Sequence, residues 1–110
     1  MKVKYNHWFA KILPGKEGWA YGKAMFGNIY FSEDKATMLE KYPSLMRHEL
    51  THIYQQEANE YFWVDYAWQW FANTIKLNGN FHQAYLDIDY EVLARESEKF
   101  PLTKEELKQF

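Results

Sequence analysis

The residues with the clearest chemical meaning form one short segment, HELTH, at positions 48–52. Its histidines, His48 and His52, are four residues apart, so on a helix they share one face and can bind one metal ion together. Glu49 projects beside them, where its carboxylate can hold and deprotonate a water molecule on that metal. The spacing therefore predicts a helical HExxH site with one Zn²⁺ per chain and Glu49 as the general base.

A catalytic zinc site of this kind needs a third protein ligand. The extended metzincin pattern requires glycine at position 55 and histidine at position 58, but the chain has Gln55 and Ala58, which excludes that pattern. The downstream candidates are Glu91 and His82. Glu91 is preferred because Ala94, three residues later, shares its helix face and allows close packing on the HExxH helix. His82 is the alternative ligand.

Three stretches of the chain resemble a known family. Residues 48–56, HELTHIYQQ, are similar to the HELTHxxQQ stretch of small, minimal gluzincin-type zinc metallopeptidase domains of bacteria and phages. Residues 27–31, GNIYF, resemble the Gly-x-x-Ile-x-Phe edge strand before the active-site helix of that family, and are one residue shorter. Residues 84–94, AYLDIDYEVLA, resemble its AYxxIPFExEA segment.

The resemblance covers about residues 24–95 and is most specific at the HELTH segment. It implies a zincin scaffold, a peptide or protein substrate, and Glu91 as the third zinc ligand. Two departures from the family pattern matter: Asp89 replaces the proline, and Leu93 replaces the second glutamate. Both departures leave Glu91 in place. The resemblance does not indicate which substrate is cleaved.

The first third of the chain has the patterns of short strands. Alternating or aromatic residues are typical of strands, and Pro14-Gly15 predicts a turn between them. These patterns occur at Val3, Tyr5, His7 and Phe9, at Trp19 and Tyr21, and at residues 28–31. We therefore expect a small N-terminal antiparallel sheet.

The remainder of the chain has the three-and-four spacing of amphipathic helices. We expect helices over about residues 43–59, beginning at Pro43, and over about residues 61–77 and 81–86. A further helix, capped by Asp87 or Asp89, should end near Phe100, and the capping box at residues 103–106 should open a short last helix. The fold class expected is α+β and zincin-like, with one domain over residues 1–110.

The segment 61–77 is unusually aromatic, and both of its faces are apolar. Its first stripe consists of Val64, Trp68, Phe71 and Ile75, and its second face of Trp63, Tyr66 and Trp70. We expect the first stripe to be core in a helix that is buried on most sides. The alternative is a partner face that makes the protein a homo-oligomer.

Hydrolysis of an amide also needs a hydrogen-bond donor for the oxyanion. The candidates near the HELTH segment or on its flanks are Tyr54, His82, Tyr85 and Tyr90, and the sequence does not choose among them. Gln55 and Gln56 are expected to support the site or to lie at the surface.

Composition excludes several classes of protein. Among 110 residues there are 13 basic and 15 acidic residues, so nothing favours nucleic-acid binding. The absence of cysteine excludes disulfides, cysteine zinc sites and cysteine nucleophiles. No segment has the pattern of a signal peptide or a membrane span, so we expect a cytoplasmic protein, with secretion by a non-classical route left open.

The function expected from the sequence is hydrolysis of peptide bonds by a zinc metallopeptidase. One alternative is a non-catalytic zinc-binding interaction module of a phage or bacterial assembly. Another is a metal-dependent hydrolase that acts on a non-peptide amide. The intact Glu49 favours an enzyme, because a purely structural zinc site has no need of a general base.

Overall fold

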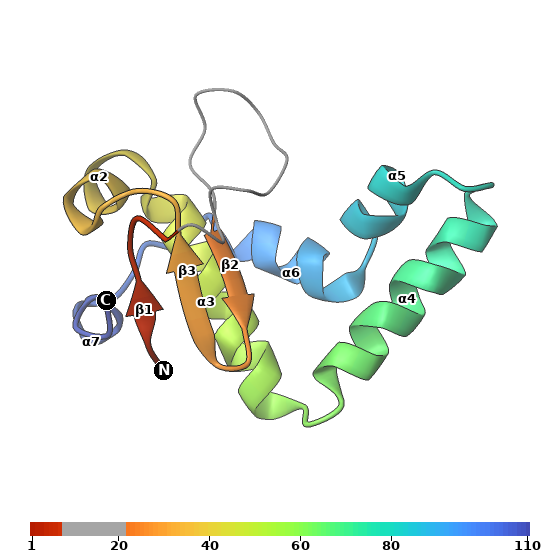
Figure 1. Ribbon diagram of the computed structural model, residues 1–110, viewed down its shortest axis with the longest axis horizontal. Helices are drawn as coiled ribbons and strands as arrows, with labels where there is room; N and C mark the ends of the chain where they lie inside the picture. Colours follow the sequence, from red (N-terminus) through yellow and green to blue (C-terminus); the bar gives the residue numbers. More distant parts are fainter. Residues whose placement is uncertain (8–21) are drawn as a thin grey trace.

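The computed structural model describes residues 1–7 and 22–110, which form an α+β arrangement of a small sheet and several helices (Figure 1). The strands are β1 (Val3–Lys4), β2 (Gly22–Met25) and β3 (Asn28–Phe31). The helices are α2 (Lys35–Lys41), α3 (Pro43–Ala58), α4 (Phe62–Lys76), α5 (Phe81–Leu86), α6 (Asp89–Ser97) and α7 (Lys104–Leu107). The α+β class is confirmed. The predicted turn at Pro14-Gly15 and the strand residues Phe9, Trp19 and Tyr21 lie outside the described residues.

The central strand of the sheet is β3, which pairs with β2 on one side and β1 on the other. The β2–β3 pair is antiparallel, as expected, and its two-residue turn places Phe26 and Gly27 at φ 52° and 78°. The expectation of a wholly antiparallel sheet is wrong, because β1 runs parallel to β3. Residues 5–21 separate β1 from β2, so no tight hairpin dictates the direction of β1.

Helix α3 lies against the sheet and carries the HELTH segment (Figure 1). Its stripe of Met46, Leu50 and Ile53 is buried in one cluster with Ile29 and Phe31 of β3. The predicted spacing of this helix is confirmed, and Pro43 occupies its first turn. Since the apolar stripe faces the sheet, His48 and His52 share a neighbouring face of the helix.

Helix α6 packs along α3 and brings the downstream glutamate to it. Ala94 is fully buried, as the close packing of the Glu-x-x-Ala segment requires, and the Thr51 hydroxyl donates to Ser97 Oγ at 2.8 Å. The predicted cap is wrong: the N-cap residue is Ile88, without a side-chain cap, and the helix ends at Ser97 rather than near Phe100. The capping box that opens α7 at Thr103 is confirmed.

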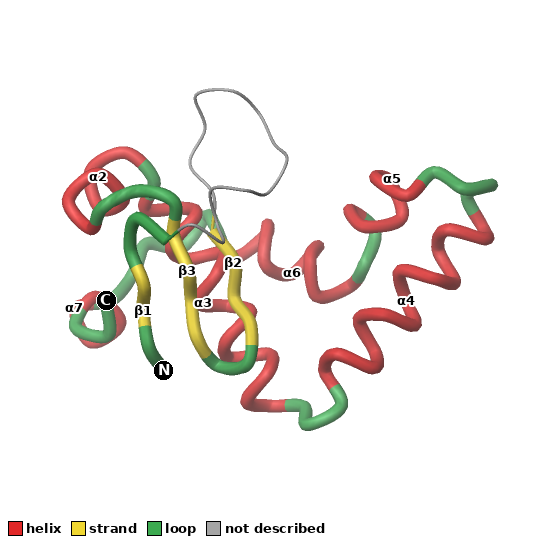
Figure 2. Tube along the Cα trace, viewed as in Figure 1, coloured by secondary structure: helices red, strands yellow, loops and turns green. Residues whose placement is uncertain are grey.

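Helices α4 and α5 lie at the opposite end of the molecule from β1 and α7 (Figure 2). The predicted core stripe of α4 is exposed: Val64 by 67%, Trp68 by 65%, Phe71 by 59% and Ile75 by 64%. Phe62 and Tyr66 are buried instead, in a cluster with Ile88. The expectation was wrong because both faces of α4 are apolar, and periodicity alone cannot say which of them faces inward. Among the described residues, no helix is long and apolar enough to cross a membrane.

Candidate metal centre

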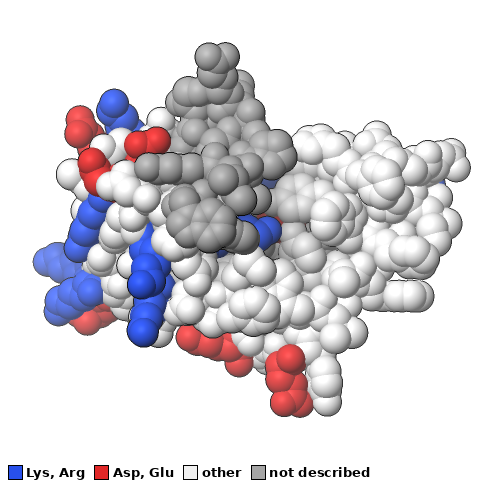
Figure 3. All heavy atoms as spheres, in the orientation of Figure 1, with Lys and Arg blue, Asp and Glu red and all other residues white. Residues whose placement is uncertain are grey.

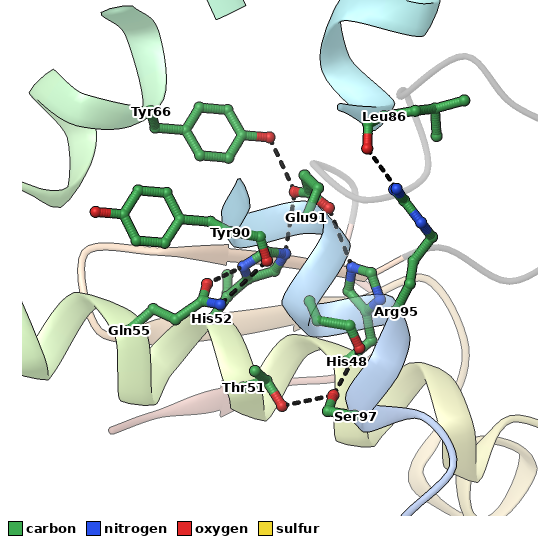
Figure 4. Close-up of polar contacts among 12 residues, drawn as sticks. His48, Thr51, His52, Gln55, Tyr66, Leu86, Tyr90, Glu91, Arg95 and Ser97 are labelled. Carbon is green, nitrogen blue, oxygen red and sulfur yellow. Dashed lines mark hydrogen bonds and ion pairs between the residues drawn. The ribbon is translucent and has the colours of Figure 1, made fainter. Parts of the chain in front are cut away.

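His48, His52 and Glu91 meet between α3 and α6 (Figure 4). The Glu91 carboxylate lies between the imidazoles, with Oε2 3.2 Å from His48 Nε2 and Oε1 3.0 Å from His52 Nε2. The three ligand atoms lie within 4.8 Å of one another, so they could hold one metal ion, and in the described part of the chain no other such group occurs. The alternative ligand His82 is exposed and lies outside this group.

The charges of the three residues are strongly coupled. Burial alone would raise the pKa of Glu91, but hydrogen bonds from His48 and His52 outweigh it and hold that pKa well below its usual range. Burial alone would lower the pKa of His48 and of His52, but hydrogen bonding to Glu91 together with the negative charges of Glu49 and Glu91 outweighs it and leaves both raised. A metal ion binds only the deprotonated nitrogen of an imidazole, so metal binding and protonation would compete at these two residues.

Gln55 orients His52 for ligation. His52 Nδ1 lies 2.8 Å from Gln55 Oε1, and the Gln55 amide nitrogen donates to the Tyr90 carbonyl at 3.0 Å. This second bond sets the amide orientation, so the oxygen accepts from Nδ1, and Nε2, which faces Glu91, is the nitrogen that could bind a metal ion. Gln56 has a different role, because it accepts from the Gly27 amide and donates to the Ala24 carbonyl, which ties the β2–β3 hairpin to α3.

Glu49 is buried next to the three residues but is not one of the group. The β2 backbone passes so close to its methylene groups that a Cβ on Gly22 would lie 2.9 Å from Glu49 Cγ. Burial raises the pKa of Glu49, and the negative charge of Glu91 adds to that effect. A buried carboxylate with a raised pKa beside such a group is a candidate for proton transfer.

A cavity of about 500 Å³ opens beside His48, His52 and Glu91, which are called the metal group below. Glu49, His52 and Glu91 line one part of it, and Gly22, Lys23 and Ala24 of β2 line another. The other lining residues in the described part of the chain are mostly aromatic and come from α4 and α5: Phe62, Trp63, Tyr66, Trp70, Phe81, His82 and Tyr85. The cavity thus joins the candidate metal site to the edge of the sheet and to the inner face of α4.

The structure separates the four oxyanion candidates into two pairs. The Tyr54 hydroxyl donates to Glu106, and that of Tyr90 bonds to Asp65 and Asn59, so both point away from the metal group. His82 and Tyr85 line the cavity. A fifth residue, Tyr66, was not among the candidates, yet its hydroxyl donates to Glu91 Oε1 at 2.9 Å. Nothing in the spacing of α4 distinguishes Tyr66 from the other aromatic residues on its face.

Comparison with known proteins returned no match to a family model, to a curated protein or to a solved structure. The interpretation of the site therefore depends on the residues and their geometry. These define a candidate metal-binding site of two histidines and one glutamate.

Proposed function

We propose that the protein is a zinc-dependent metallopeptidase with a zincin-like fold of the gluzincin kind. The observation that carries the proposal is Glu49, buried beside the group of His48, His52 and Glu91 at the edge of a 500 Å³ cavity. Two imidazoles and one carboxylate are a common ligand set of catalytic zinc, because they leave a fourth position open. Structural zinc sites are instead closed by four protein ligands.

In this proposal a zinc ion held by the three residues would supply Lewis acidity to polarise the scissile carbonyl and to acidify water. Glu49 holds the attacking water, accepts its proton and passes that proton to the leaving amine. His82 and Tyr85, on the far wall of the cavity, are the candidate donors to the oxyanion.

An extended peptide could align along the edge strand β2. Strand β3 is not available for this role, because it is paired on both sides and has no free edge. Strand β2 pairs with β3 alone among the described strands, and its residues Lys23 and Ala24 line the cavity. Strand addition at β2 would carry the substrate backbone past Glu49.

Substitution of Glu49 by Gln tests the proposal, because Gln has the same shape but does not accept a proton. We expect zinc content and melting temperature to persist, while cleavage of unfolded casein falls by roughly 10²–10⁴. The matched control is Glu57→Gln, at an exposed position of the same helix. Equal activity in the wild type and Glu49→Gln would refute the role of Glu49, and zinc binding without hydrolysis in either would favour the non-catalytic module.

The outer face of α4 supports a second proposal, self-association. Its exposed residues Val64, Trp68, Phe71 and Ile75 follow a four-three-four spacing, which suits packing against another helix. Figure 3 shows few charged atoms over the α4–α5 end of the molecule. A specific interface buries at least about 1,000 Å² in all, so each copy would contribute roughly 500 Å². We propose that a second copy of the chain covers it, with the two α4 helices related by a two-fold axis.

A further inference from the structure

The carboxylate of Glu91 accepts a hydrogen bond from a helix that carries no member of the metal group. Tyr66 of α4 donates to Glu91 Oε1 at 2.9 Å, and both side chains are buried (Figure 4). Tyr85 of α5 lines the same cavity, where burial raises its pKa and the negative charge of Glu91 adds to that effect. The third ligand of the candidate site is therefore supported from α4 as well as from its own helix.

Support of this kind matters more for Glu91 than for the two histidines. His48 and His52 stand one turn apart on α3, a long helix packed on the sheet. Glu91 instead lies in the first turn of α6, a helix without a side-chain cap. Its longer, more flexible side chain has two equivalent oxygens, either of which could turn toward a metal ion.

The Tyr66 ring is itself held in place. Its centroid lies 5.6 Å from that of Phe62 and 5.7 Å from that of Trp63, and Ile88 belongs to the same buried cluster. A tyrosine hydroxyl at the end of a packed ring has little freedom, so it donates its hydrogen bond to one oxygen of Glu91 from a fixed direction. The other oxygen, Oε2, faces His48.

We propose that Tyr66 is a positioning residue for the metal site: its hydroxyl holds Glu91 Oε1 and so presents the carboxylate to the ion in one orientation. The inference rests on the proposed function only in assuming that His48, His52 and Glu91 bind a metal ion, and it does not require that a peptide is hydrolysed. It also links the wall of the cavity to the ligand set, because Tyr66 lines that cavity.

Zinc affinity of the purified, metal-stripped chain tests this inference through competition with a chromogenic chelator. Tyr66→Phe removes the hydroxyl and keeps the ring, and we expect it to weaken zinc binding roughly 10–100-fold, as is typical for loss of a partner behind a ligand. Tyr61→Phe is the matched control, because Tyr61 is an exposed tyrosine at the start of the same helix. The absorption spectrum of bound Co²⁺ gives a second readout that reports ligand geometry and that a general loss of stability would not shift.

Weaker zinc binding and an altered Co²⁺ spectrum in Tyr66→Phe, with neither change in Tyr61→Phe, would support the inference even if no peptide is cleaved. Unchanged affinity in Tyr66→Phe would overturn it, and would leave the proposed function standing if the wild type hydrolyses peptides. If the wild type takes up neither ion, the positioning role is overturned together with the metal site. If Tyr66→Phe does not fold, Tyr66→Met, which also lacks the hydroxyl, is measured in the same way, and unchanged affinity there overturns the inference.

Discussion

Gly22→Ala is the substitution for which the structure predicts the most specific effect on Glu49. A Cβ at position 22 would lie 2.9 Å from Glu49 Cγ and 3.0 and 3.1 Å from two ring carbons of Phe31. Comfortable contacts between carbon atoms are about 3.5–4.0 Å, so the neighbours would have to move by roughly 0.5–1 Å. Both neighbours are buried, which leaves them little room to do so. The backbone of Gly22 lies outside the left-handed region, so the substitution tests the contact alone.

The expected cost has a structural and a catalytic part. Overpacking of this kind typically lowers the free energy of unfolding by about 1–3 kcal/mol. Each kcal/mol corresponds to a fall in melting temperature of about 4–8 °C in a domain of nearly this size. A misplacement of about 1 Å in a catalytic group can cost on the order of 100-fold in rate. We therefore expect Gly22→Ala to keep its zinc, lose several degrees of melting temperature and lose at least tenfold in turnover.

Gly27→Ala is the matched control, because it changes a glycine of the same hairpin that has no neighbour within 4 Å of the added Cβ. Gly27 has φ +78°, so its substitution should cost about 1–2 kcal/mol through backbone strain while Glu49 stays in place. Melting curves, zinc content by mass spectrometry and casein hydrolysis are measured for both variants. Wild-type turnover and melting temperature in Gly22→Ala would refute the close approach. An equal loss of turnover in both variants would attribute the loss to general destabilisation.

Three further predictions concern stability, assembly and the dependence of stability on pH. Trp68→Ala should change the free energy of unfolding by no more than about 0.5 kcal/mol because Trp68 is exposed, whereas Phe62→Ala at a buried position should cost about 3–5 kcal/mol. Trp68→Ala should also abolish self-association in sedimentation experiments; a wild type that remains monomeric at high concentration would reject the α4 interface. The Arg47 hydrogen bonds hold the pKa of Glu106 at about 2 instead of 4.5, so its ionised form stabilises the fold above pH 4.5, and that contribution is lost as the pH falls toward 2. Melting temperatures across this range should fall more steeply for the wild type than for Glu106→Gln, and parallel curves would contradict this assignment.

Much of the candidate site could be predicted from the sequence because its geometry is local. His48 and His52 share a helix, and their spacing alone places them side by side. The preference for Glu91 depended on one longer-range argument, that Ala94 would let its helix approach α3, and the burial of Ala94 agrees with it. Gln55 lies three residues after His52, so its support of that histidine could also be read from helical spacing.

The errors concern features for which the sequence provides no local signal. In α4, both the outer stripe with Trp68 and the inner face with Tyr66 are apolar, so the hydrophobic pattern is consistent with either face being buried. The parallel direction of β1 depends on where the chain returns to the sheet rather than on the residues of the strand. The contact of Tyr66 with Glu91 joins residues 25 positions apart, and no periodicity extends that far across a change of helix.

The metal group and the cavity wall depend on different parts of the fold, and this division has a consequence for function. His48 and His52 are set by the packing of α3 on the sheet, whereas the aromatic wall belongs to α4 and α5. Glu91 of α6 connects the metal group with the aromatic wall, because its carboxylate contacts the histidines on one side and Tyr66 on the other. A change in α4 that moves Tyr66 would therefore alter the cavity and the presentation of Glu91 together, whereas a change confined to the outer stripe would alter neither. For this reason the two faces of α4 should respond differently to substitution: the inner face through zinc affinity, and the outer face through assembly alone.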